Sequence, residues 1–222
     1  MKGGNTILKM LDSAQATLPV AGVALQRLRD RVESTHFRSL EDRRFFSDRI
    51  LPFLAAQSAR EILYVGCRSY TEDAVARLGQ SGARVWTTDI DPDAARYGNG
   101  AHHRTLDITE ITSESFPVSQ FDMICLNGII GHGVDADPAI TKLMLALSRV
   151  LVPGGLLLIG WNRGRSSDPM GFAETRSNFE PVNMDRLASR TGFASNDHVF
   201  DMLVRSNSGT GDHRNPELLA SA

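Results

Sequence analysis

The chain has few cysteines, no long apolar run and almost no net charge, and each absence excludes a class of protein. Its two cysteines, Cys67 and Cys125, form no CxxC pair and no zinc-ligand spacing, so we expect no disulfide framework and a reducing compartment. No apolar stretch approaches the about 20 residues of a membrane span, and the N-terminus lacks the apolar core of a signal peptide. We therefore expect a cytoplasmic protein that is not associated with a membrane.

The charge balance also limits the partners. The formal net charge is −2, from 24 basic and 26 acidic residues, which favours neither nucleic acid nor an anionic membrane surface as a partner. With 222 residues, of which 41% are hydrophobic, the chain is long enough for one sizeable α/β domain with its own core.

A buried strand followed by a glycine is the most informative segment of the sequence. Residues 61–66 read as this strand, ending at Gly66, and a helix is expected from Thr71. A second apolar run over residues 83–88 ends at Asp89. A strand, a glycine turn, a helix and a second strand ending in an acid make up half of a nucleotide-binding α/β unit, because the glycine admits a ligand to the backbone and the acid accepts from ribose hydroxyls.

Strands and helices alternate over residues 60–160, which predicts a doubly wound, mostly parallel sheet with helices on both faces. The predicted strands are 62–66, 84–88, 103–106, 121–126 and 155–160, and the predicted helices are about 71–80, 92–98 and 138–150. In such sheets the ligand crevice lies outside the carboxyl ends of the strands, which is where Gly66, Asp89, Asp107 and Asn127 fall.

The remaining segments suggest three parts of the chain. Residues 1–58 are predicted as an N-terminal helical cap, with one helix from Pro19 and another over about 40–56 that Pro52 kinks or restarts. This cap either covers the sheet only or closes the ligand site. Residues 59–205 form the α/β domain, with a late helix over 183–190 and a last strand over 197–205, and residues 206–222 are expected to be a disordered tail.

Five segments in this order resemble motifs of the Rossmann-like, class I S-adenosylmethionine-dependent methyltransferases. They are ILYVGC from Ile62, VWTTDIDP from Val85, LDI from Leu106, FDMICLN from Phe121 and LVPGGLLLI from Leu151. The resemblance implies that the chain is a methyltransferase that uses S-adenosylmethionine. The family also closes its sheet with an antiparallel last strand. Since few residues follow Gly192, that strand could be missing or could come from a second copy of the chain in a homodimer.

The resemblance assigns roles to residues on the first two strands. Gly66 and Cys67 would contact the methionine portion of the cofactor through their backbone, and Asp89 would hold the ribose hydroxyls with both carboxylate oxygens. Asp91 stands directly before Pro92 and is predicted to cap a helix rather than to bind ribose.

The adenine and sulfonium contacts follow from the next two strands. By the same resemblance, Ile90 would lie against the adenine face, Asp107 would accept from the adenine amino group, and Ile108 would donate its backbone amide to the ring. Asn127 and Gly128 would line the floor beneath the sulfonium. Asp107 is alternatively an ordinary loop acid.

The first motif departs from the family pattern. The family usually continues as Gly-Cys-Gly-x-Gly, whereas Gly66 is followed here by Cys67, Arg68, Ser69 and Tyr70. Arg68 could face away, could pair with the cofactor carboxylate, or could mark a site that no longer binds the cofactor. The missing glycines weigh even more against a nicotinamide-dependent oxidoreductase, whose fingerprint needs them for the pyrophosphate and for helix packing.

His132 is the candidate general base, because it stands between two glycines after the fourth strand and has a reference pKa of about 6.5. The alternative is a histidine that only bonds a loop carbonyl. No metal site is expected. The Asn-Pro-Pro-Tyr tetrad of enzymes that methylate amide or ring nitrogens in nucleic acid and protein is absent, and together with the near-neutral charge this points to a small-molecule acceptor, methylated on oxygen or nitrogen. Two alternatives stay open for the segment after the fifth strand. Either the acceptor pocket is lined by Trp161, Arg163 and Arg165, or Trp161 only fills space in the core and both arginines are solvated. In the first case, a segment from Phe172 would cover the substrate.

Two function classes therefore stay open beside the oxidoreductase. The first is a small-molecule methyltransferase, and the second is a non-catalytic or repurposed methyltransferase fold that acts through a partner.

Overall fold

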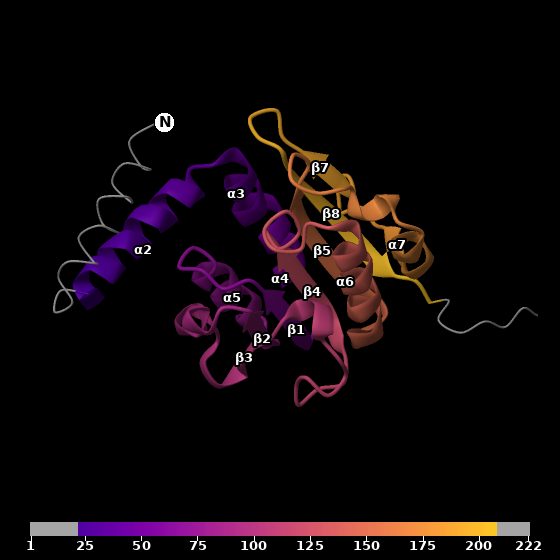
Figure 1. Cartoon of the computed structure of the whole chain (residues 1–222), viewed down its shortest axis with the longest axis horizontal. Helices are drawn as coiled ribbons and strands as arrows, with labels where there is room; N and C mark the ends of the chain where they lie inside the picture. The colour runs from indigo at the N-terminus through magenta and orange to yellow at the C-terminus, as the bar shows by residue number, and fades with distance from the viewer. Residues whose placement is uncertain (1–21, 208–222) are drawn as a thin grey trace, which may run out of the picture.

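One mixed sheet forms the centre of the computed structural model, which describes residues 22–207 (Figure 1). In spatial order, its eight strands within these residues are β3 (His103–Thr105), β2 (Arg84–Asp89), β1 (Glu61–Val65), β4 (Phe121–Asn127), β5 (Leu151–Asn162), β8 (His198–Arg205) and β6 (Phe179–Pro181), with β7 (Arg190–Gly192) also pairing with β8. The first five are parallel, and β8 runs antiparallel to β5, β6 and β7. The chain reverses its direction across the sheet between β1 and β4, which is where open sheets of this type bind ligands.

The central strands are buried on both faces. On β1, Leu63 and Val65 belong to one hydrophobic core, whereas Ile62 and Tyr64 belong to the other. Successive side chains of a strand point to opposite faces, so a parallel strand covered on both sides reads as a continuous apolar run. This explains why the predicted strands lie so close to the observed ones.

Helices cover both faces of the sheet. On one face, α6 (Asp137–Val150) supplies Leu143 and Leu147 to the first core, and α7 (Ala173–Asn178) packs against α6. On the other face, α4 (Leu51–Ala55) and α5 (Glu72–Gly79) supply the second core. The predicted doubly wound, mostly parallel sheet is therefore confirmed, with the sheet lying between these layers (Figure 1). Short 3-10 helices complete the connections: η3 (Pro92–Tyr97), η4 (Gly100–His102), η5 (Ile108–Glu110) and η6 (Pro169–Gly171).

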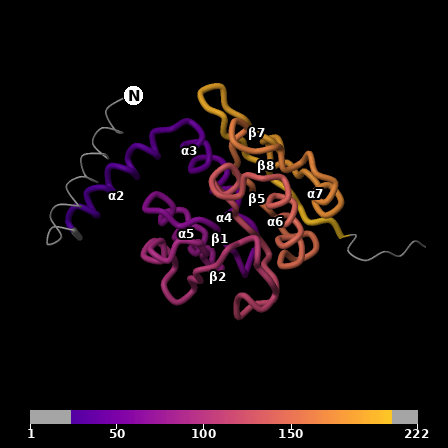
Figure 2. Tube along the Cα trace, viewed as in Figure 1, coloured from indigo at the N-terminus to yellow at the C-terminus, as the bar shows by residue number. Residues whose placement is uncertain are grey.

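The N-terminal part is helical, as predicted, over the residues that the structure describes. It consists of α2 (Gly22–Arg38), α3 (Glu41–Phe45), the π-helical turn η2 (Phe46–Ile50) and α4. Pro52 lies in the first turn of α4, directly after the π-helical turn, since it has no N–H to continue the preceding ladder. Figure 2 shows α2 as an outer element of the trace. The predicted helix start at Pro19 lies outside the described residues.

Contacts tie α2 to the loops at the carboxyl edge of the sheet. The Tyr97 hydroxyl donates to Asp30 Oδ1 at 2.6 Å, and Ser34 Oγ lies 3.2 Å from Ser69 Oγ. Thus α2 rests on the loop that follows β1 and on η3. This arrangement brings the end of α2 to the ligand edge of the sheet.

Two expectations for the C-terminal part are corrected. The predicted helix over 183–190 is wrong: Met184 and Leu187 form an isolated bridge, Asp185 has a left-handed φ of 52°, and the Asn183 side chain accepts from the Ser189 amide instead of capping a helix. The last strand is not missing, because β8 inserts between β5 and β6 of the same chain. No second copy is needed to supply it. Of the predicted tail, residues 208–222 lie outside the described part.

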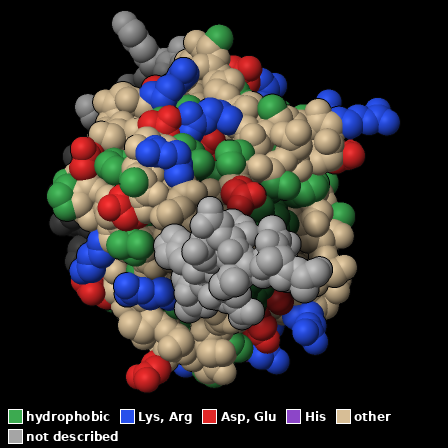
Figure 3. Space-filling model, turned by 90° about the vertical axis from the view of Figure 1, so that its right-hand side faces the viewer, with side chains coloured by type: hydrophobic (Ala, Val, Ile, Leu, Met, Phe, Trp, Pro, Cys, Tyr) green, Lys and Arg blue, Asp and Glu red, His purple; other side chains and the backbone are tan. Residues whose placement is uncertain are grey.

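The described surface and helices add two observations. None of the helices within residues 22–207 is long and apolar enough to cross a membrane. On the face drawn in Figure 3, acidic and basic side chains are interspersed and do not gather into a patch of one sign.

Candidate active site

A cavity of about 450 Å³ lies at the carboxyl ends of the first four strands of the chain. This volume is within the usual range of about 300–1,000 Å³ for small-molecule sites. Except for Cys67, every residue proposed from the sequence as a cofactor or catalytic residue lines it: Gly66, Arg68, Asp89, Ile90, Asp107, Ile108, Asn127, Gly128 and His132. The parallel sheet therefore brings together residues that are up to 66 positions apart, from 66 to 132.

Gly66 provides the close approach to the backbone that the first motif requires. Its φ is 89°, and a Cβ there would lie 3.3 Å from Ile129 Cδ1, so a side chain would be strained and crowded. The next residue, Cys67, is fully buried and its amide donates to Asp89 Oδ2 at 2.8 Å. Burial, followed by the Asp89 charge, raises the pKa of the Cys67 thiol to about 12, so the thiol stays neutral and unreactive.

Asp89 ends β2 and is 5% exposed, with most of its hydrogen-bonding capacity used inside the protein. Its Oδ2 accepts from the Cys67 amide and from Arg68 Nη1, both at 2.8 Å, and its Oδ1 accepts from the Asp91 amide at 2.9 Å. A carboxylate has about four acceptor sites. The occupied sites leave one, on Oδ1, for a ribose hydroxyl unless Arg68 moves.

Arg68 makes a contact that the sequence analysis did not predict. Its guanidinium faces the cavity and pairs with Asp89, and the same Nη1 donates to the Cys67 carbonyl at 2.6 Å. The Arg68 side chain remains 43% exposed, so solvent weakens this ion pair and a ligand can displace the guanidinium.

The far wall of the cavity offers an apolar surface beside a carboxylate. Ile90 is 68% exposed, an unusual position for a large aliphatic side chain, and it faces the cavity. Asp107 caps η5, its Oδ1 accepting from the Thr109 amide and hydroxyl, both at 2.9 Å. Its Oδ2 accepts from none of the described residues, so it is free to accept from a ligand, and the buried Ile108 lies directly beside it.

The floor of the cavity is the end of β4. Asn127 Oδ1 is buried without a hydrogen-bond partner among the described residues, and a Cβ at Gly160 would lie only 2.3 Å from it. Gly128 follows with a φ of 75°, and its amide donates to the Gly160 carbonyl at 2.9 Å. A glycine on β5 therefore makes the room in which Asn127 sits.

His132 is held by side chains, not by a loop carbonyl. Its Nδ1 lies 3.4 Å from Arg165 Nη1, and its Nε2 lies 3.2 Å from Asn162 Oδ1. A guanidinium can only donate, so Nδ1 is the acceptor and Nε2 carries the proton in this arrangement. Asn162 is fixed in turn, because its Nδ2 donates to Asp197 Oδ1 at 2.7 Å.

Sequence reasoning missed one side of the cavity. Phe37 from the end of α2 and Arg43 from α3 line it together with Tyr70. The Phe37 and Tyr70 rings stack, with centroids 4.3 Å apart, and the Arg43 guanidinium lies 5.8 and 5.6 Å from them. No motif marks these residues, because only the packing of α2 and α3 against the sheet brings them to the site.

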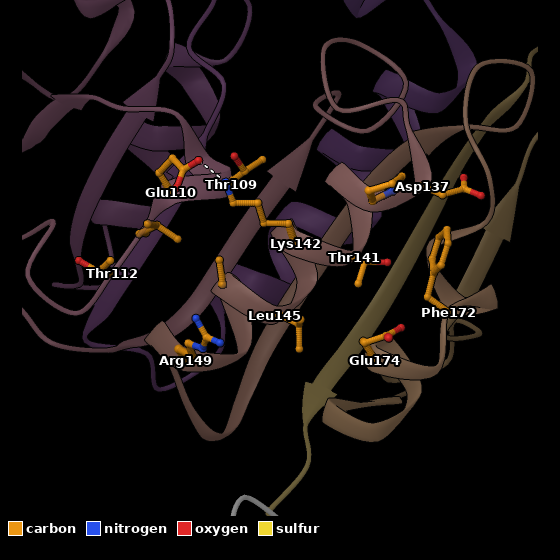
Figure 4. A pocket seen from close by; sticks show the side chains of 13 residues that line it. Thr109, Glu110, Thr112, Asp137, Thr141, Lys142, Leu145, Arg149, Phe172 and Glu174 are labelled. Carbon is orange, nitrogen blue, oxygen red and sulfur yellow. Dashed lines mark hydrogen bonds and ion pairs between the residues drawn. The ribbon is translucent and has the colours of Figure 1, made fainter.

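Some proposed acceptor residues lie elsewhere. Trp161 is 3% exposed and donates to Asp201 Oδ2 at 2.8 Å, which makes it an aromatic plug. Arg163 donates to the Phe193 carbonyl. Phe172 lines a separate, open groove of about 690 Å³ beside α6, where Figure 4 shows Lys142 and Glu110 joined by an ion pair. Among residues 22–207, no group of three or more His, Cys, Asp or Glu side chains is placed to hold a metal ion.

Comparison with known proteins shows which family this part of the chain resembles. Residues 63–159 match the family described as "Methyltransferase domain". This segment is therefore similar to methyltransferase domains. It spans β1 to β5 and thus contains the residues of the strand ends that form the cavity. The predicted Rossmann-like methyltransferase is confirmed, and the methyltransferase domain implies S-adenosylmethionine as the cofactor.

Solved structures show the same fold. The N-methyltransferase NodS from Bradyrhizobium japonicum WM9, in complex with S-adenosyl-L-homocysteine, is similar with a TM-score of 0.54 and 15% identity over 79% of this chain and 97% of that chain. A TehB-like SAM-dependent methyltransferase from Corynebacterium glutamicum gives a TM-score of 0.54 and 18% identity over 79% of this chain and 100% of that chain. No curated protein gives a match to the sequence.

Proposed function

We propose that this methyltransferase domain transfers the methyl group of S-adenosylmethionine to an oxygen or nitrogen atom of a small molecule. The cavity carries this proposal, because it gathers a carboxylate at the end of β2, an exposed Ile90, a free Asp107 oxygen and the ring of His132 around one space. The first three fit an adenosine group, and the family match supplies the class of chemistry.

Each binding residue would contact a different part of the cofactor. Asp89 Oδ1 would accept from one ribose hydroxyl, and Oδ2 from the second once Arg68 is displaced. Ile90 would cover an adenine face, and Asp107 Oδ2 would accept from the amino group. The cofactor supplies a methyl group that is already activated on a sulfonium. The protein then contributes mainly by holding the acceptor in line with that methyl group.

His132 is proposed as the general base for the acceptor. In the tautomer that its two partners imply, the basic atom is Nδ1, which receives the weak 3.4 Å bond from Arg165. Proton uptake at Nδ1 therefore requires Arg165 to move aside, for example toward Asp197, whose pKa is lowered by the Asn162 bond and which stays ionised near neutral pH.

A small acceptor fits the space better than a macromolecule. The cavity of about 450 Å³ must hold both cofactor and acceptor, and Phe37, Arg43 and Tyr70 close one side of it. NodS, which shares the fold, is an N-methyltransferase, and this supports nitrogen as one candidate acceptor atom.

The Arg68–Asp89 ion pair supports a second candidate, a methyltransferase fold that no longer binds the cofactor and acts through a partner. In that case the pair would be permanent.

Calorimetric titration of the purified protein with S-adenosylmethionine and S-adenosylhomocysteine separates the two candidates. Binding at micromolar concentrations supports the enzyme, and an Asp93→Asn variant, an exposed acid outside the cavity, should bind equally well. If neither ligand binds at millimolar concentration, the proposed enzyme is refuted and the second candidate takes its place.

A further inference from the structure

We infer that Arg43 anchors the carboxylate of a small acidic acceptor at the side of the cavity closed by α2 and α3. This inference rests on the proposed function, since it names the acceptor class of the same site. Arg43 belongs to α3, a segment outside the residues that match the methyltransferase family.

The guanidinium of Arg43 is confined but poorly satisfied. Its side chain is 17% exposed, and Nε is buried without a hydrogen-bond partner among the described residues. The nearest carboxylate oxygen, Asp42 Oδ2, lies 3.4 Å from Nε, longer than the about 2.7–2.9 Å of a good charge-assisted bond. None of its guanidinium N–H groups donates a hydrogen bond to the part of the chain that the structure describes.

The Asp42 carboxylate contacts other side chains as well as Arg43, so it does not form a paired hydrogen-bond contact with the guanidinium. Its Oδ1 accepts from Asn196 Nδ2 at 3.0 Å, and its Oδ2 lies 3.6 Å from His198 Nδ1. Burial and the nearby Arg43 charge lower the pKa of His198 to about 3, so this histidine is neutral near pH 7. The charge of Arg43 is therefore balanced nearby, but its planar fork of donors has no matching acceptor within the described residues.

The aromatic rings hold this fork at the cavity. The guanidinium lies over the stacked rings of Phe37 and Tyr70, which restrict its motion through cation–π contacts. Arg43, both rings and Asn127 also line a small adjoining pocket of about 30 Å³, which is room for a small polar group. A carboxylate matches a guanidinium fork through two parallel hydrogen bonds, and the rings provide an apolar wall for the rest of the molecule.

The position of Arg43 points to the acceptor. Asp42, its neighbour in sequence, bonds Asn196 just before β8, whereas the ribose carboxylate Asp89 ends β2. Three strands, β1, β4 and β5, separate β2 from β8, and neighbouring strands lie about 4.8 Å apart. Arg68, the other arginine that lines the cavity, is already paired with Asp89. Arg43 is thus the cation left for a ligand at the side away from the adenosine groups.

The test uses calorimetry with two probe pairs. Benzoate and its neutral analogue benzamide are titrated into protein saturated with S-adenosylhomocysteine, and also into protein without it. S-adenosylhomocysteine and 5′-methylthioadenosine, which lacks the amino-acid carboxylate, are titrated into the free protein. The variants are Arg43→Gln, Arg43→Lys and, as a matched control, Arg44→Gln, the exposed next residue of α3 that lines neither pocket. The melting temperature of each variant checks its folding.

We expect the wild-type protein to bind benzoate in preference to benzamide. Arg43→Gln should weaken benzoate binding about 10- to 100-fold, the scale of a lost charge-assisted pair. Arg43→Lys should recover part of this loss, and Arg44→Gln should change nothing. The affinity for S-adenosylhomocysteine should stay within about threefold in every variant, because its ribose and adenine are assigned to Asp89, Ile90 and Asp107 and the inference gives Arg43 to the acceptor.

Three results would overturn the inference. The first is wild-type protein that binds benzoate and benzamide equally or binds neither, and the second is unchanged benzoate binding in Arg43→Gln. The third is an Arg43→Gln variant that loses S-adenosylhomocysteine but keeps 5′-methylthioadenosine, which would assign Arg43 to the cofactor carboxylate. If benzoate binds through Arg43 while no cofactor ligand binds, the anchor stands and the proposed methyl transfer fails.

Discussion

The two sides of the cavity are built in different ways. At the side formed by β2 and β3, Asp89 ends β2 and Asp107 follows β3. Asp89 accepts from the Asp91 amide and from the Cys67 amide in the loop after β1, and Asp107 accepts from the Thr109 amide. At the side formed by α2 and α3, Phe37 and Arg43 meet Tyr70 only because helices pack over the sheet. The first side depends on sheet topology and local turns, and the second depends on tertiary packing.

Their chemistry differs in the same way. The strand side offers carboxylate oxygens and an exposed Ile90, which suit hydroxyl, amino and apolar groups of a nucleoside. The helix side offers a guanidinium and aromatic rings, which suit an acid. Under the proposed function, the strand side would hold the cofactor and the helix side would hold the acceptor.

The largest effect is expected at His132, which lies between the two sides. His132→Ala should lower turnover about 10²–10⁴-fold with cofactor affinity intact, because it removes the proposed base and no cofactor contact. Steady-state rates across pH, together with titration of S-adenosylhomocysteine, measure this. Near-normal turnover at every pH would remove His132 from the role of base.

The next effect isolates the strand side. Asp89→Ala should weaken binding of S-adenosylhomocysteine by about 1–3 kcal/mol, the scale for losing hydrogen bonds to a charged group. Binding of benzoate at the helix side should change much less. Since Asp89 also accepts from the Cys67 amide, the melting temperature must be recorded, and Asp89→Asn serves as the variant of similar shape. An unchanged affinity in both variants would contradict the ribose assignment.

The same contrast explains what the sequence could predict. Strands β1 to β5, the antiparallel strand β8 and the residues Gly66, Asp89, Asp107 and Asn127 were predictable, because apolar runs and the glycine and acid at strand ends reflect short-range constraints. Strand ends share one edge of a parallel sheet, so their residues meet regardless of loop details.

The remainder depends on side-chain geometry that no local pattern encodes. The pairing of Arg68 with Asp89 joins residues on different strand-end loops, and the placement of Arg43 depends on how α3 follows α2. The segment at 183–190 misled the prediction because Asn183 bonds the Ser189 amide and Asp185 turns the chain with a left-handed φ. A capping residue was visible there, but the alternative bond it makes was not.

A pH measurement sharpens the comparison on the helix side. Burial holds the pKa of His198 at about 3 in the folded protein, against about 6.5 when unfolded. The unfolded chain thus binds more protons between these values, so the free energy of unfolding falls as the pH is lowered from about 6.5 toward 3. Between pH 6 and pH 5, wild-type protein should lose about 1 kcal/mol more than His198→Asn, measured by urea unfolding. Equal losses would show that His198 gains a compensating partner when protonated, with Asp42 the nearest carboxylate.

The smallest effect is expected at Arg68. Its ion pair with Asp89 occupies an acceptor site that a ribose hydroxyl would use. Because its side chain is 43% exposed, its ion pair with Asp89 contributes about 1 kcal/mol or less. Arg68→Ala frees an acceptor site on Asp89 Oδ2, so affinity for 5′-methylthioadenosine should rise, by at most about fivefold. Calorimetry at low and high salt measures this rise, which should shrink in high salt because the competing pair is already screened. Arg104→Ala, an exposed arginine on β3 outside the cavity, is the control. A loss of affinity in Arg68→Ala would instead make Arg68 a ligand-binding group, and the departure from the family's glycine-rich loop would then be part of how this chain holds its cofactor.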